Sequence, residues 1–455
     1  MKRLDDAPIS RFHLRVCLYT GGGMFCDGYI IGSIGLALPL LAARMNIGSV
    51  WEGLLGAAAL VGIFAGAMIF GPVTDAFGRQ KVLLADLMLF AVASVLQLFV
   101  SGPYPLLVLR LILGVAIGAD YAISPSLLSE FAPRRHRGVL LGSLNVIWTA
   151  GFVAAYGVGL GLRSWLGPQS WRWMLASSAV PALVTLLMRF GSPESPRWLV
   201  GKGRHEEARE IIDKHFGPEY AVDGSGVDGS EADAVPGRVS YRELFSARYR
   251  ARAIFAGMFW FCQVFPYFGI GTFLPRIVEA FGIHNADLGV VLYNVLLLAG
   301  AVAGCVLMDR IGRRTFVIWS FAVIGAALLF LGIQPHAHVW ILAPVFLAVA
   351  FVLSAAAGLE FLYPAEVFPT EVRASGVGLA AAISRSGAAI STFILPIALS
   401  GLGIGPTMLI LAAVVGLGLA ISVSLAPETR GLLLDEGARG AATDLHGIPA
   451  ADLAK

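Results

Sequence analysis

The sequence GPVTDAFGRQK at residues 71–81 forms a short polar segment between two long apolar stretches, and a shortened copy, DRIGR, occurs at residues 309–313. The aspartates of the two copies, Asp75 and Asp309, lie 234 residues apart. Two further motif pairs recur at offsets of 236 and 234 residues: EFAPRRHR at 130–137 with EVFPTEVR at 366–373, and PES at 193–195 with PET at 427–429. Three motif pairs with nearly one period indicate an internal duplication.

The segments between these motifs are strongly apolar. Of the 455 residues, 57% are hydrophobic and only 14% are charged, and the mean hydropathy is +0.76. A helix of about 20 apolar residues crosses the ~30 Å hydrocarbon core of a bilayer. Twelve such stretches occur between residues 14 and 426. We therefore expect an all-α membrane protein with twelve transmembrane helices in two six-helix bundles.

Basic residues set the expected orientation. Lys and Arg gather near the N-terminus and in the polar segments around residues 79, 135 and 313. By the positive-inside rule, both termini and the central polar segment are cytoplasmic. The expected organisation is an N-terminal bundle at 1–191, a central loop at 192–246 that reads as an acidic tether, a C-terminal bundle at 247–426 and a tail at 427–455. Halves that share one orientation can rock about a central site.

Several protein classes are excluded by composition and motifs. The net charge is only +3, without a basic run that could follow a phosphate backbone, so we expect no nucleic-acid partner. No phosphate-binding loop, metal-spaced His/Cys set or nucleophile motif occurs, so we expect no enzyme, catalytic residue, metal or cofactor. The four cysteines lie in or beside apolar stretches and read as small hydrophobes, and no cleaved signal peptide is expected. A sensor that binds without transporting is disfavoured by the short tail.

The repeated motifs resemble those of a known family. Residues 71–81 resemble the signature loop of the major facilitator superfamily, and PESPRW at 193–198 and PETRG at 427–431 resemble motifs of its sugar porter branch. The resemblance covers about residues 13–431 and implies the major facilitator fold. It also implies a cytoplasmic gate of acidic, basic and glycine residues at helix ends, which pair in one conformation and separate in another. The residues that match are Gly71, Asp75, Gly78, Arg79, Glu130, Arg137, Glu194, Arg197, Asp309, Gly312, Arg313, Glu366, Arg373 and Glu428.

Ionisable residues inside apolar stretches are costly and therefore mark candidate functional positions. Asp27 and Arg110 fall at similar depth on their helices, so we expect them to pair and proton binding to Asp27 to release Arg110. Asp120 lies about 15 Å further along its helix and suggests a second proton station. The run Arg110-x-x-x-Gly114-x-x-x-Gly118 also resembles a superfamily motif linked to proton translocation. A structural pair without a coupling role remains the alternative.

The second half carries a different buried charge. Arg385 lies about 18 Å along its helix from Arg373, near mid-membrane, where it needs an anionic partner. That partner is either Glu360 or a substrate carboxylate or phosphate held by the planar guanidinium. The segment at 384–388, SRSGA, resembles the Arg-x-Gly-Ala of aromatic acid symporters. The expected substrate-binding residues are Asn145, Trp148, Gln263, Tyr267, Glu360 and Arg385, of which Asn145 and Gln263 match sugar-binding amides of sugar porters.

These patterns predict a secondary transporter. The leading hypothesis is proton-coupled import of a small organic anion, such as a carboxylate or aromatic acid. We expect the transporter to be a monomer in the plasma (inner) membrane. The expected energy source of this transporter is the proton gradient. Its expected partners are the substrate, protons and lipid. The alternatives are proton-coupled uptake of a sugar or polyol, then phosphate uptake or proton-driven efflux. The charge of the ligand distinguishes these hypotheses, because binding of an anion should depend on Arg385 and binding of a neutral sugar on Asn145 and Gln263.

Overall fold

The computed structural model describes residues 2–3, 8–133, 136–190, 192–218, 220–221, 244–246, 249–283, 285–368 and 372–429. Residues 219 and 222–243 of the predicted central loop, and most of the tail, lie outside these residues. The same holds for several expected gate side chains, although their backbone is described: those of Asp75, Glu130, Arg137, Arg197, Asp309 and Arg373, together with the surroundings of Gly71.

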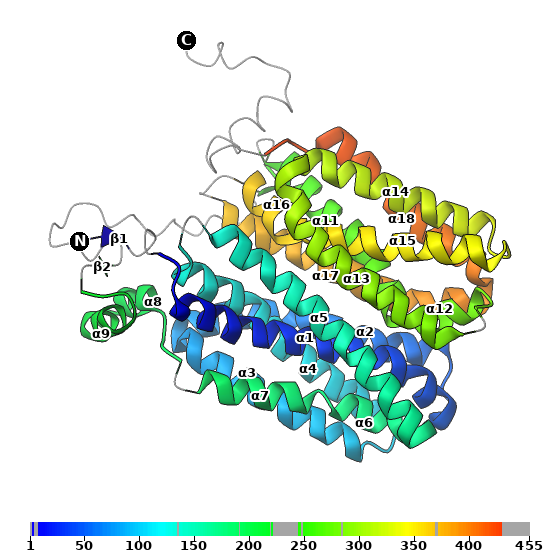
Figure 1. Ribbon diagram of the computed structural model, residues 1–455, viewed down its shortest axis with the longest axis horizontal. Coiled ribbons are helices and arrows are strands. Elements are labelled where there is room, and N and C mark those ends of the chain that lie inside the picture. The colour runs from blue at the N-terminus through cyan, green and yellow to red at the C-terminus, as the bar shows by residue number, and fades with distance from the viewer. Residues whose placement is uncertain are drawn as a thin grey trace, which may run out of the picture. The chain divides into compact units, whose positions relative to one another are not determined.

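The chain divides into two compact units, and the first comprises Met1–Asn46 and Ala58–Val235. Its apolar helices are α1 (Arg11–Met45), most of α2 (Ser49–Phe77), α3 (Arg79–Leu96), α4 (Pro103–Phe131), α5 (Arg137–Leu166), α6 (Ser170–Ala176) and α7 (Ala179–Arg189), with 3₁₀ turns η2 (Gln97–Phe99) and η3 (Gly167–Gln169). Helix α1 packs along α5 and α4, and α3 packs against α4 and α7 (Figure 1).

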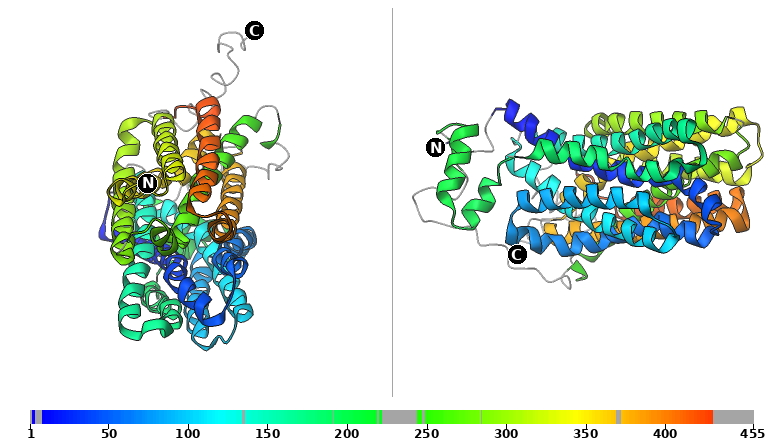
Figure 2. Two further views of the ribbon diagram at one scale, coloured as in Figure 1. Left: turned by 90° about the vertical axis from the view of Figure 1, so that its right-hand side faces the viewer. Right: turned by 90° about the horizontal axis from the view of Figure 1, so that it is seen from below.

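Two short helices complete the first unit, α8 (Pro196–Gly201) and α9 (His205–His215). They lie beyond one end of the long helices of this unit, near the start of α1 (Figure 2). A parallel pair of two-residue strands, β1 (Lys2–Arg3) and β2 (Tyr220–Ala221), lies beside α9. This pair is a small departure from the expected all-α chain.

The second unit comprises Ile47–Ala57 and Pro236–Lys455. Its helices are α11 (Arg250–Thr272), α12 (Leu274–Ala280), α13 (Ala286–Ile311), α14 (Arg313–Ile333), α15 (Val339–Ala357), α16 (Leu359–Val367), α17 (Arg373–Leu402) and α18 (Ile404–Leu425). Helix α11 packs along α17, as α1 packs along α5 in the first unit. The first turns of α2 cluster with this unit, where Glu52 forms a bidentate ion pair with Arg276 of α12.

The helices are long and apolar enough to cross a membrane. Within the described residues, 11 stretches meet this criterion, and one of them, Val139–Arg189, is 51 residues long. Because about 20 residues suffice for one crossing, this stretch, which contains α5, η3, α6 and α7, has the length of two. Large apolar side chains such as Trp165, Leu187 and Trp340 lie exposed on the protein surface, as expected where lipid replaces water. The multi-pass helical architecture is thus confirmed, while the count of twelve and the cytoplasmic termini stay predictions.

Glycines on α4 allow it to approach α2 closely. A Cβ atom at Gly114 would overlap the Ala59 carbonyl, and one at Gly118 would lie 2.5 Å from the Ile63 carbonyl. These are the two glycines that follow Arg110 at four-residue intervals, and small residues at such spacing are typical of tight helix packing in membranes.

Candidate functional site

The matched motifs of the two halves form matched helix caps. Glu194 accepts hydrogen bonds from the backbone N–H groups of Arg79 (3.1 Å) and Gln80 (3.1 Å), the first residues of α3. In the second half, Glu428 accepts from the backbone N–H of Arg313 (2.9 Å), the first residue of α14. The carboxylates thus satisfy free N–H groups and lie at the positive end of each helix dipole.

A glycine precedes each capped helix, and its missing side chain makes room for the cap. Gly78 and Gly312 have φ angles of 99° and 94°, in the region that favours glycine. A Cβ atom at Gly78 would lie 2.5 Å from Glu194 Oε2, and one at Gly312 would lie 2.9 Å from Glu428 Oε2. These four gate residues are therefore brought together in two equivalent pairs.

In the second half, an ion pair lies beside the cap. The guanidinium of Arg313 lies 3.4 Å from Glu366, whose carboxylate also accepts a hydrogen bond from the Thr429 hydroxyl (2.6 Å). Four expected gate residues of this half, Gly312, Arg313, Glu366 and Glu428, thus lie in one network. The expectation that this network opens and closes during transport stays a prediction.

A cluster of buried charges lies inside the first unit. Asp27 of α1 and Asp120 of α4 are fully buried, and Asp86 of α3 and Arg189 of α7 are nearly so. The three carboxyl groups act on one another electrostatically, and Arg189 acts on all three. Four helices thus each contribute one ionisable side chain to the same interior region.

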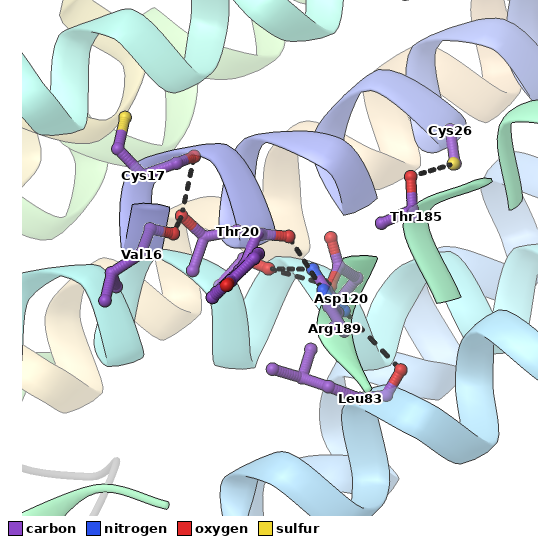
Figure 3. Close-up of polar contacts among 10 residues, drawn as sticks. Val16, Cys17, Thr20, Cys26, Leu83, Asp120, Thr185 and Arg189 are labelled. Carbon is purple, nitrogen blue, oxygen red and sulfur yellow. Dashed lines mark hydrogen bonds and ion pairs between the residues drawn. The ribbon is translucent and has the colours of Figure 1, made fainter. Parts of the chain in front are cut away.

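Arg189 joins the helices that surround this cluster. Its Nη2 lies 3.4 Å from Asp120 Oδ1 and from the Ser124 hydroxyl, its Nε donates to the Tyr19 carbonyl (2.7 Å), and its Nη1 donates to the Leu83 carbonyl (3.5 Å). Figure 3 shows Arg189 beside Asp120, with the contact to Leu83 on the opposite side. One guanidinium therefore contacts α1, α3 and α4 from its place at the end of α7.

The prediction that Asp27 pairs with Arg110 is wrong. Arg110 is buried, but its Nη1 donates to the backbone carbonyl of Ile30 (2.9 Å), about one turn from Asp27 on α1. The basic group that acts on Asp27 is Arg189. Depth along the helices correctly placed Arg110 beside α1, but it could not fix the direction in which each side chain points.

Two members of the cluster were missed by sequence reasoning. Asp86 lies inside the third apolar stretch, residues 82–101, and had the same signal as the other buried acids, because it is an ionisable residue in an apolar stretch. Arg189 lies next to the end of the sixth stretch, residues 171–190, a position typical of an ordinary basic residue at a helix end. Its burial results from packing between α1, α3 and α4, for which the sequence carries no direct signal.

The second unit holds a separate buried charged group. The guanidinium carbon of Arg385 on α17 lies 5.9 Å from the ring centroids of both Trp260 and Phe268 on α11. The charge of Arg385 acts on Glu360 of α16, whose Oε2 accepts a hydrogen bond from Trp260 Nε1 (2.8 Å). Arg385 is therefore flanked by two aromatic faces and one carboxylate, which is an arrangement that combines cation–π and ionic stabilisation.

The other expected substrate-binding residues fall into two groups. In the second unit, Gln263 donates to the Leu353 carbonyl (2.8 Å), and the Tyr267 ring contacts the Phe268 ring at 5.5 Å. Both residues lie on α11, the helix that carries Trp260 and Phe268. Asn145 and Trp148 belong to α5 of the first unit, where Trp148 stacks on Phe152 with 5.8 Å between centroids.

Two duplicated sets of long apolar helices, each with a capped helix start and buried ionisable side chains, define a membrane transporter. The model of the family described as Sugar (and other) transporter matches residues 16–440, and the chain belongs to that family. Because this is a family of transporters, the expectation that the chain is not an enzyme is confirmed.

Curated relatives agree with this assignment. The inner membrane metabolite transport protein YgcS of Escherichia coli is 40% identical, over 95% of this chain and 95% of its own length. A D-xylose transporter of Levilactobacillus brevis is 30% identical over 85% of this chain and 86% of its own length. The niacin transporter NiaP of Acinetobacter baylyi is 26% identical over 85% of this chain and 87% of its own length.

Solved structures confirm the fold. The partially occluded inward-open structure of the xylose transporter XylE from E. coli superimposes with a TM-score of 0.77 at 22% sequence identity, covering 93% of this chain and all of XylE. XylE is a protein of the major facilitator superfamily. The major facilitator fold expected from the repeated motifs is thus confirmed.

Proposed function

We propose that this protein imports a small organic anion, a carboxylate or an aromatic acid, together with protons. The observation that carries the proposal is Arg385, a buried guanidinium placed between the rings of Trp260 and Phe268. A carboxylate can take a bidentate position on such a guanidinium, and an aromatic ring attached to it can stack on the flanking side chains. A family relative, NiaP, transports niacin, which is an aromatic acid.

The proposed energy source is the proton gradient, with the buried acids of the first unit as proton carriers. Asp27 and Asp120 keep the coupling role that the sequence suggested for them, and Arg110 supports α1 through its bond to Ile30. We further propose twelve spans, cytoplasmic termini and central loop, an inner-membrane location and a monomeric state. The capped starts of α3 and of α14 then keep the gate role expected for them, each within its own unit.

Uptake of a neutral sugar is the second candidate. It is favoured by the L. brevis relative that transports D-xylose and by the buried amide side chain of Gln263 on α11. A sugar site needs several neutral hydrogen-bonding partners, and binding of a neutral ligand does not require the charge of Arg385. The two candidates therefore differ in their dependence on Arg385.

Ligand-induced thermal stabilisation of the purified protein separates the candidates. The panel consists of benzoate, nicotinate, succinate, inorganic phosphate, xylose and sorbitol, because a ligand that binds only the folded state stabilises it by about 2.7 kcal/mol at 100 times its Kd. We expect a carboxylate to raise the melting temperature, and Arg385→Gln to abolish the rise and lower uptake at least tenfold. Uptake into vesicles should increase when the outside is acidic.

A matched variant controls for loss of a basic residue. Arg314→Gln removes a guanidinium that donates to the Val423 carbonyl in the same unit, and it should bind carboxylates like the unmodified protein. Arg385→Lys keeps the charge but loses the planar fork, so it should bind weakly. If only xylose or sorbitol stabilises the protein, or if Arg385→Gln binds carboxylates normally while Glu360→Gln does not, the anion proposal is wrong.

A further inference from the structure

Three buried carboxyl groups in the first unit share one guanidinium. Asp27 and Asp120 have no exposed surface, and Asp86 and Arg189 are 4% and 2% exposed. With all four groups ionised, the cluster would hold an excess of two negative charges. Buried charges without partners cost several kcal/mol each. The two excess negative charges must therefore be removed by protons or compensated by another positive group.

Other compensating groups are absent from the described part of the chain. No basic side chain other than Arg189 forms an ion pair with these acids there, since Arg110 bonds to the Ile30 carbonyl. No three described acids, histidines or cysteines are arranged to hold a metal ion. Among the described residues, the thiol of Cys26 also interacts with the cluster, but a thiol is either neutral or negatively charged and cannot compensate the acids.

The hydrogen bonds show which acids lack partners. Asp120 Oδ1 accepts from the Ser124 hydroxyl (2.7 Å) and faces Arg189 (3.4 Å), as an ionised carboxylate would. Both oxygens of Asp27 and both of Asp86 are buried, and none accepts a bond from a hydroxyl or basic side chain among the described residues. The second oxygen of Asp120, Oδ2, is also buried and accepts no hydrogen bond among the described residues.

From this juxtaposition, we propose that Asp27, Asp86, Asp120 and Arg189 form one site that binds two protons, on Asp27 and Asp86, while Asp120 stays ionised against Arg189. The proposal rests on the proposed proton coupling and adds Asp86 and Arg189 to it. Release of a proton leaves a second carboxylate to compete for Arg189, which also bonds to Tyr19 on α1 and Leu83 on α3. Proton binding is thereby linked to the packing of α1, α3, α4 and α7.

Infrared spectroscopy of the purified full-length protein at neutral pH tests the site directly, because protonated carboxyl groups have a distinct C=O stretch. Asp27→Asn and Asp86→Asn should each remove part of this band. Arg189→Gln should enlarge it by a similar amount, since Asp120 then takes up a proton. Asp213→Asn, which changes an exposed acid paired with Arg209, should leave the band unchanged.

Opposite results would overturn the proposal. An unchanged band in Asp86→Asn means that Asp86 is ionised, and an unchanged band in folded Arg189→Gln means that Arg189 does not set the charge of Asp120. Loss of the band and a higher melting temperature when K⁺ is exchanged for Na⁺ would identify a sodium site instead. Neither measurement uses an organic anion, so their failure is distinguishable from failure of the Arg385 experiment.

Discussion

At the scale of single residues, Gly23 on α1 is the position that leaves space for the charged cluster. A Cβ atom there would lie 2.5 Å from Arg189 Nη2 and 2.5 and 2.7 Å from the two carboxylate oxygens of Asp120. No real side chain tolerates such distances, so even a methyl group must displace the ion pair. The glycine is therefore part of the site although it has no side chain.

We expect Gly23→Ala to destabilise the protein by about 1–3 kcal/mol, the usual cost of overpacking a filled interior. It should also reduce proton-driven uptake, because Arg189 and Asp120 must shift. Melting temperature and vesicle uptake are the measurements. Gly161→Ala on α5 is the matched control, since a Cβ there meets nothing within 4 Å, and it should be neutral or slightly stabilising. Equal behaviour of the two variants would contradict the proposed constraint.

The sequence predicts which buried residues matter better than it predicts their partners. Asp27, Asp120 and Arg385 are recognisable because each is an ionisable residue in an apolar stretch. The partner of Asp120 is Arg189, which is 69 residues away and looks like a helix-end charge. The pairing depends on the rotation of α7 about its axis, and that rotation follows from packing of the whole unit rather than from local sequence.

At the scale of secondary-structure elements, α9 is attached to the start of α1 by aromatic contacts. The His215 ring stacks on Phe12 at 4.2 Å with an interplanar angle of 23°, and Phe216 meets the edge of the same ring at 5.3 Å. Partial burial lowers the pKa of His215, and the charges of Lys214 and Arg15 lower it further. The folded arrangement therefore favours the neutral imidazole.

The sign of the pH dependence follows from that pKa. A lowered pKa in the folded state means that attachment of α9 is fully stabilised above the unfolded value of about 6.5 and weakens as pH falls toward the folded value. We expect hydrogen exchange in residues 205–216 to become several-fold faster at pH 5.5 in the unmodified protein than in His215→Phe, which keeps the stacking ring but cannot be protonated. At pH 7.5 the two proteins should exchange alike. Faster exchange in His215→Phe at pH 5.5 would rule out this explanation.

At the scale of the whole molecule, the duplication read from three motif pairs is present as repeated structure. The bond from the Arg79 amide to Glu194 and the bond from the Arg313 amide to Glu428 both join residues 115 positions apart. The motif offsets predicted these acids and arginines to lie together. They could not predict that each carboxylate caps the backbone of a helix, because the cap depends on the glycine φ angle and on the return of the chain to the start of α3 or α14.

The two caps lie in separate units and share no partner, so their contributions to stability should be equivalent and additive. We expect Glu194→Ala and Glu428→Ala each to cost about 1–2 kcal/mol, because each leaves helix N–H groups without an acceptor. The double variant should show the sum within about 0.5 kcal/mol, as distant independent sites do. Denaturant or thermal unfolding in detergent, followed by tryptophan fluorescence, measures these differences. Glu207→Ala, which removes an exposed acid paired with Arg204, should have little effect on stability, because solvent screens an exposed ion pair. A large loss in one capped half and none in the other would show that the repeated motifs are not energetically equivalent, and a strong departure from additivity would show that the two caps are energetically coupled.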